Sequence, residues 1–105
     1  MDMHVAISKN DDGSVEIYFV GIEHWDCFNL LLGLLEQENG CKIVSNKEII
    51  YFREAKLIHN NLYFSLRHDD MFGNYLFTND TKDVQELEKL AINIVNSIKA
   101  KLENV

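Results

Sequence analysis

Hydrophobic and polar residues alternate with a period of two from Glu54 to Thr78, which predicts two consecutive β-hairpins. The alternating runs of the first hairpin meet at Asn60-Asn61, a pair that tolerates the positive φ angles of a two-residue turn. Counting outward from this turn places Glu54 directly opposite Arg67 on one face and apolar residues opposite one another on the other face. One face of the sheet is therefore expected to be buried and the other exposed.

Two further connections complete the predicted hairpins. The second hairpin turns at 69–73 and returns along 74–78, so an acidic and aromatic turn joins its strands. Near the N-terminus, a run of alternating residues on each side of the turn signal 9–13 predicts another hairpin. Pairing Ile7 with Val15 keeps the apolar residues of both strands on one face, as the period of two requires.

A spacing of three and four residues between apolar side chains predicts two helices. The first is expected over 23–38, with Trp25 on its apolar face and a stop at Asn39-Gly40. The second begins with Asp80 as the N-cap, and Asp83 lies near its positive end. Its apolar stripe comprises Val84, Leu87, Ala91, Ile94, Ile98 and Leu102.

The segment between the first helix and Glu54 is less periodic. Residues 41–45 form a short strand candidate, and Asn46-Lys47 reads as a turn. The apolar run 49–52 that follows is compatible with a strand covered on both faces, or with a bulge or bend before Arg53.

These elements predict a single α+β domain over residues 1–105. The order is ββα, then a run of strands, then a final helix, and the short connections favour antiparallel neighbours. Because each helix has one apolar face and the sheet has one charged face, we expect an antiparallel sheet of five to six strands with both helices packed on one side.

Composition limits the possible partners. The chain has 47% hydrophobic and 26% charged residues, which is typical of a folded domain. Ten basic and seventeen acidic residues give a formal charge of −7, so nucleic acid is not an expected partner. The sequence shows neither a secretory signal nor an apolar run of the roughly 18–20 residues that span a bilayer, which predicts a cytoplasmic protein without membrane binding. Cys27 and Cys41 are expected to remain reduced.

The candidate chemistry does not predict an enzyme. His59 and His68 fall at opposite ends of one strand pair, and the other histidines have no ligand spacing, so no metal site is expected. His68-Asp69 does not form a catalytic dyad, because adjacent strand residues point to opposite faces. No phosphate-binding or dinucleotide motif is present, so we expect no catalytic residues and no cofactor.

The surface features favour protein binding instead. Acidic pairs occur at two predicted turns, where adjacent acids are typical solvated turn formers, and one pair has aromatic neighbours. Aromatic anchors within an acidic rim suit a basic protein partner. The candidate partner-binding residues are Asp69, Asp70, Phe72, Tyr75, Asp11, Asp12, Tyr63 and Glu54.

In its size, its acidity, its N-terminus without a signal sequence and its order of elements, the chain resembles the small acidic immunity proteins of contact-dependent growth inhibition and related polymorphic toxin systems. The stretch LYFSLRHDDMFGNYLF, residues 62–77, is the nearest feature to a motif. The resemblance implies a non-enzymatic protein that binds a cognate toxin domain, often a basic nuclease, and covers its active site. The alternative is a housekeeping homodimer or adaptor that uses the open sheet face or an edge strand.

Overall fold

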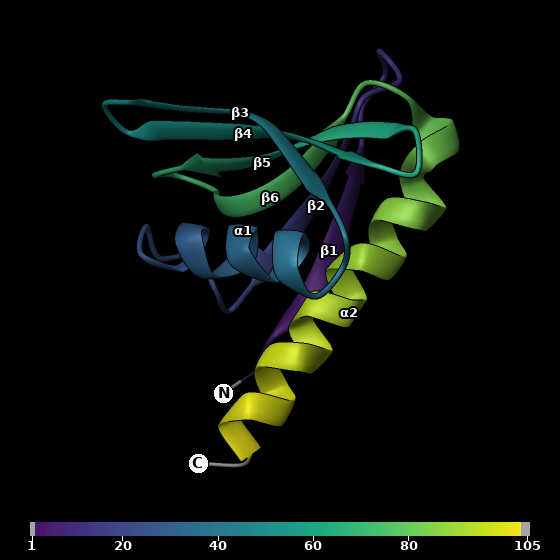
Figure 1. Cartoon of the computed structure of the whole chain (residues 1–105). Helices are drawn as coiled ribbons and strands as arrows, with labels where there is room; N and C mark the ends of the chain where they lie inside the picture. Colours follow the sequence, from purple (N-terminus) through teal and green to yellow (C-terminus); the bar gives the residue numbers. More distant parts are fainter. Residues whose placement is uncertain (1, 104–105) are drawn as a thin grey trace.

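The fold is an α+β arrangement of six strands and two α-helices, seen in a computed structural model that describes residues 2–103 (Figure 1). In chain order the elements are β1 His4–Lys9, β2 Val15–Val20, α1 Cys27–Gln37, β3 Lys42–Ile49, β4 Phe52–His59, β5 Leu62–Asp69, β6 Gly73–Thr78, a short 3₁₀ helix Thr81–Asp83, and α2 Val84–Glu103. The predicted fold class is confirmed.

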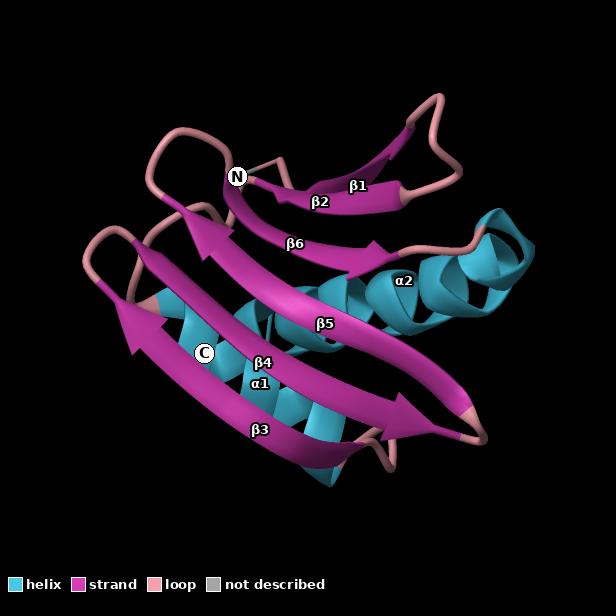
Figure 2. Ribbon diagram, turned by 90° about the horizontal axis from the view of Figure 1, so that it is seen from above, coloured by secondary structure: helices cyan, strands magenta, loops and turns pink. Residues whose placement is uncertain are grey.

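All six strands belong to one antiparallel sheet with the order β1-β2-β6-β5-β4-β3. Figure 2 shows both helices behind this sheet, on the same face. Helix α2 packs against β1 and β2, and α1 packs against β5. The opposite face of the sheet carries no helix in the part of the chain that the structure describes.

The core lies between the sheet and the helices, where the alternating apolar residues of the strands meet the apolar stripes. Its largest fully buried side chains include Phe19, Phe28, Leu31, Leu66 and Ile94. The predicted register of the β4–β5 hairpin is confirmed, with Glu54 opposite Arg67 on the helix-free face.

The N-terminal hairpin keeps its predicted faces but not its predicted register. Ile7 pairs with Ile17 rather than with Val15, a shift of two residues. The reason is a tighter connection, in which the Asn10 N–H donates to the Ser14 carbonyl at 2.9 Å. Because the shift is even, each side chain still points to its expected face.

Helix α1 begins at Cys27, so its predicted start at residue 23 is wrong and Trp25 lies in the preceding turn. The buried Asn74 side chain explains the difference. Its Nδ2 donates to the carbonyls of Ile22, at 2.8 Å, and His24, at 3.1 Å. In an earlier helical turn the Ile22 carbonyl would accept the Asp26 N–H, which instead donates to His24 Nδ1 at 3.0 Å. The predicted stop is confirmed, because Gly40 has φ 68° directly after the helix.

Strand β3 is continuous through Asn46 and Lys47, so the turn predicted there is wrong. These residues pair with β4, and the turn lies at Ile50-Tyr51 instead. Pairing along the whole length of β4 outweighs the local turn preference of two polar residues, which are tolerated because β3 is an exposed edge strand. Of the alternatives that the sequence leaves open for the run 49–52, the bend before Arg53 is the one that occurs, as the Ile50-Tyr51 turn. A separate β-bulge in β3 lies at Val44, between Ile43 and Ser45.

The last helix agrees with its prediction except at its C-terminal end. The Asp80 side chain accepts the Lys82 N–H at 3.0 Å and so caps the 3₁₀ turn that leads into α2. The apolar stripe is buried as far as Ile98, whereas Leu102 is 55% exposed, so its place in the stripe is wrong. Within residues 2–103, no helix combines the length and apolar character needed to cross a membrane.

Candidate protein-binding surface

Three connections converge at one end of the sheet. Phe52 pairs with Asp69, and Asp69 pairs with Gly73, so the β3–β4 and β5–β6 turns are neighbours. The segment between β2 and α1 reaches the same end (Figure 1, left). We call this surface the apolar end, and it consists of Trp25, Ile49, Ile50, Tyr51, Met71 and Phe72. All of these except Trp25 are more than half exposed.

The β3–β4 turn holds its aromatic residue in an unfavourable backbone conformation. Ile50 and Tyr51 form a two-residue connection between the paired residues Ile49 and Phe52. Tyr51 has φ 68°, in the left-handed region that costs a residue with a Cβ about 1–2 kcal/mol. Both turn residues are largely exposed, Ile50 at 79% and Tyr51 at 71%. The turn therefore exposes two large apolar side chains and lowers local backbone stability.

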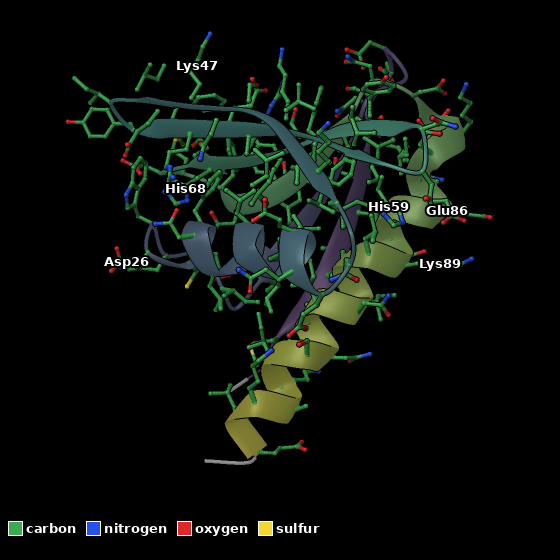
Figure 3. The ribbon with its side chains drawn as sticks, viewed as in Figure 1. Asp26, Lys47, His59, His68, Glu86 and Lys89 are labelled. Atoms are coloured by element: carbon green, nitrogen blue, oxygen red, sulfur yellow. The ribbon has the colours of Figure 1, made fainter. Side chains whose placement is uncertain are left out.

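A buried polar cluster fixes the position of Trp25. Asn74 is fully buried and, besides holding the Ile22 and His24 carbonyls, its Oδ1 lies 2.9 Å from His68 Nδ1. Since the Asn74 amide nitrogen donates to the carbonyls, Oδ1 accepts and His68 Nδ1 carries the proton. The His68 ring meets the Trp25 ring edge-on at 4.8 Å between centroids. In Figure 3, His68 points into the space between the sheet and α1.

Arg53 supports the same indole from within the protein. The residue is 8% exposed, and its guanidinium carbon lies 4.1 Å from the Phe28 ring centroid and 5.6 Å from that of Trp25. It has no carboxylate partner within residues 2–103, and its Nε has no hydrogen-bond partner there. The aromatic rings supply its compensating attraction. His68 and Arg53 thus hold Trp25 in place from the protein side, on what we call its rigid base, while part of the indole remains exposed.

Acidic residues border the apolar side chains. Two hollows adjoin Trp25 and Tyr51, one of about 270 Å³ that includes Asp70 and one of about 400 Å³ that includes Glu48. A third hollow, of about 370 Å³, lies between Phe72 and β2. The apolar end therefore has the composition of an interface centre with a negative rim.

The structure brings together three of the eight residues predicted to bind a partner. Asp69, Asp70 and Phe72 lie at the apolar end. Their roles differ, because Asp69 Oδ1 accepts the Met71 N–H at 2.8 Å and holds the turn. Asp70 is about half exposed, with Oδ1 3.3 Å from His68 Nε2, and is available to a partner.

The other five predicted residues lie elsewhere. Tyr75 is only 7% exposed and packs against Tyr18, so its side chain is not an accessible anchor. Glu54 is occupied in an ion pair with Arg67 at 2.7 Å. Tyr63 is exposed near the opposite end of the sheet, and the β1–β2 loop at that end contains Asp11 and Asp12.

Sequence reasoning missed five residues of the apolar end, which are Trp25, Ile49, Ile50, Tyr51 and Met71. The signal was the unbroken apolar run 49–52, which lacks the alternation of a strand with one wet face. With the turn placed at Asn46-Lys47, this run was left either as a covered strand or as a bulge or bend before Arg53, so its exposure at a hairpin tip was not recognised.

On the helix-free face of the sheet, side chains contact one another more than they do at the apolar end. One row of paired side chains crosses all six strands and consists of Ala6, Tyr18, Tyr75, Arg67, Glu54 and Lys47. Within it Arg67 pairs with Glu54 and also stacks over Phe77 at 3.8 Å. Arg67 and Glu54 thus already satisfy each other, and both line a hollow of about 320 Å³ on this face.

Neither the histidines nor the cysteines form a reactive cluster within residues 2–103. No group of three His, Cys, Asp or Glu side chains there is placed to hold a metal ion. Cys27 and Cys41 are free thiols. Burial raises the pKa of both, that of Cys41 to about 11, so both favour the unreactive thiol form near neutral pH.

Comparison of the chain with protein-family models, with curated proteins and with solved structures finds no match in any of the three.

Proposed function

We propose that this protein is a non-enzymatic immunity protein that uses its apolar end to bind a cognate bacterial toxin domain and to cover its active site. The observation that carries the proposal is the cluster of exposed apolar side chains, most of all Ile50 and Tyr51, on a rigid base with an acidic rim. Exposed apolar clusters with a polar border are typical of protein-binding sites.

The residue types support a protein partner. Binding energy in interfaces is concentrated in a few residues, and Trp and Tyr are enriched among them. Trp25 is held by His68 and Arg53, so little side-chain entropy remains to be lost when it is covered. A strained Tyr51 turn is also consistent with function, because strained backbone conformations cluster at functional sites.

The charge supports a basic partner. The chain carries a formal charge of −7, and Glu48 and Asp70 border the apolar residues. A nuclease needs a positive cleft to hold phosphates, and an acidic protein is attracted by the same field. A nuclease domain neutralised in the cytoplasm is therefore the toxin class that fits best.

The alternative, a housekeeping homodimer or adaptor, is less well supported. An edge strand is a natural site for pairing two copies, and β3 is an exposed edge. However, β3 contains the charged residues Lys42, Lys47 and Glu48 and a bulge at Val44, which are features that oppose strand pairing. In Figure 3, Lys47 points away from the helices, above the open sheet face.

The test uses the variable C-terminal domain of any large secreted protein encoded beside this gene. The wild-type protein should rescue growth when that domain is co-expressed, and should bind it in calorimetry. Tyr51→Ala should weaken binding by about 30-fold or more, as expected for an interface hot spot. Tyr63→Ala is the matched control, because Tyr63 is equally exposed, 69% against 71%, but lies near the other end of the sheet.

Three results would overturn the proposal. If the wild-type protein neutralises no neighbouring toxin domain, the immunity function is wrong. If it instead sediments as a dimer that Tyr51→Ala dissociates, the apolar end is a contact between two copies and the alternative holds. Equal losses in Tyr51→Ala and Tyr63→Ala would move the interface away from the apolar end.

A further inference from the structure

The two hollows beside Trp25 and Tyr51 point to a more specific chemistry than general apolar contact. We infer that they form a receptor for one lysine or arginine side chain, which the basic partner of the proposed function would supply. Trp25, Ile50 and Tyr51 line both hollows, Asp70 completes one and Glu48 completes the other.

The aromatic residues provide the first part of this recognition. The faces of Trp and Tyr rings carry partial negative charge and attract ammonium and guanidinium groups. The Asp70 hollow, at about 270 Å³, lies just below the range of about 300–1,000 Å³ that is typical of small-molecule sites. A single side chain inserted from a protein surface suits a space of this size.

The carboxylates provide the second part. Asp70 is exposed over about half of its side chain and can accept a charge-assisted hydrogen bond from an incoming cation. Glu48 is exposed, lines the second hollow and can do the same. A cation in either hollow would therefore meet aromatic side chains and one carboxylate.

Arg53 opposes this arrangement, because its guanidinium carbon already lies 5.6 Å from the Trp25 centroid. Each hollow has one carboxylate in its lining, Asp70 or Glu48, whereas Arg53 lines neither hollow. Arg53 is also buried on the protein side of the indole, whereas the hollows open to solvent. Its main effect is to hold the ring in place.

The test exploits Trp25 as the single tryptophan of the chain, whose indole N–H gives one cross-peak in an ¹H–¹⁵N spectrum. The probe is N-acetyl-arginine methylamide, and the control is N-acetyl-citrulline methylamide, which has nearly the same shape without the charge. The arginine probe should shift the indole peak to saturation. The citrulline probe should leave it in place.

Variants then separate the site from general attraction to an acidic protein. Glu48→Gln with Asp70→Asn should raise the dissociation constant of the arginine probe by at least about tenfold, through loss of the charged acceptors. Asp11→Asn with Asp12→Asn removes the same amount of charge at the opposite end of the sheet. This control should leave the dissociation constant of the arginine probe unchanged. A non-saturating shift, an equal response to citrulline, or an equal constant in the first variant would overturn the inference.

The outcome is independent of the toxin experiment. If the arginine probe does not bind while the toxin domain does, the receptor is wrong and the immunity function stands. If the probe binds while no neighbouring toxin domain does, the receptor stands and the proposed function is wrong.

Discussion

The β3–β4 turn and the β4–β5 turn have the same length but opposite residue types. Asn60 and Asn61 make the second turn with φ 48° and 67°, values that asparagine tolerates. Ile50 and Tyr51 make the first, and Tyr51 has φ 68°, almost the same as that of Asn61. The turns differ in that only the second residue of the apolar turn has a positive φ, but residue types that suit this conformation are used at Asn61 and not at Tyr51. Local turn stability therefore does not account for the apolar turn.

The remaining connections repeat this contrast. In the β1–β2 loop, at the same end as Asn60-Asn61, Asp12 accepts the Ser14 N–H at 2.9 Å and its hydroxyl at 2.6 Å. These bonds lower the pKa of Asp12, because they stabilise its carboxylate. The β5–β6 turn at the apolar end has a similar bond at Asp69 but exposes Met71 and Phe72. We call the end with Asn10–Ser14 and Asn60-Asn61 the polar end.

The largest expected effect comes from the core that both ends share. Ile94 is fully buried in α2, so Ile94→Ala should lower the free energy of unfolding by about 2–5 kcal/mol through lost contacts and a cavity. Urea unfolding measures this change. Under conditions in which Ile94→Ala remains folded, it should bind the toxin domain like the wild type. A loss below about 0.5 kcal/mol, the range of surface changes, would contradict the assignment of Ile94 to the core.

A second substitution should affect the apolar end alone. Asn74→Ala leaves the Ile22 carbonyl and the His68 Nδ1–H without their buried partner, at a cost of about 2–3 kcal/mol. The His24 carbonyl loses one donor but keeps the Cys27 N–H at 2.9 Å. The substitution should also release Trp25 toward water, which a red shift of tryptophan fluorescence would report.

The control for Asn74→Ala is Asn10→Ala at the polar end, where the side chain is exposed and bonds Ser14 and Glu16. We expect that control to lose only about 0.5–1 kcal/mol, without a fluorescence change. Equal losses in the two variants would show that the buried cluster does not organise the apolar end.

The sequence predicts regions governed by short-range patterns better than those governed by distant contacts. The Asn60-Asn61 turn and the Asp80 cap follow from local residue preferences, and both are confirmed. The start of α1 depends on Asn74, about fifty residues away in the chain, so no local signal at residues 23–26 reveals it. The site was only partly predicted, because its exposed turn depends on the register of β3 against β4.

Charge reversal should separate the two ends kinetically. Glu48→Lys with Asp70→Lys should slow association with the toxin domain by about tenfold at low salt, because the local field that steers a basic partner is reversed. Asp69 is left unchanged, since it holds the turn.

Asp11→Lys with Glu86→Lys changes the net charge equally but lies away from the apolar end, as Figure 3 shows for Glu86. This control should slow association less than the variant at the apolar end. Stopped-flow measurements at two salt concentrations test both variants, and equal rates would mean that only net charge matters.

The smallest effect is the most direct test of the comparison, because Tyr51 and Asn61 have nearly equal φ angles and can exchange residue types. Tyr51→Asn should raise the free energy of unfolding by about 0.5–1 kcal/mol, since asparagine tolerates the left-handed region better. Asn61→Tyr should lower it by a similar amount. Binding should change in the opposite direction. Tyr51→Asn, the more stable variant, should no longer bind the toxin domain, whereas Asn61→Tyr, the less stable one, should still bind it. Urea unfolding and calorimetry measure the two quantities on the same samples. If Tyr51→Asn is both more stable and fully able to bind, the exposed tyrosine has no role in recognition, and the contrast between the two turns has no functional meaning.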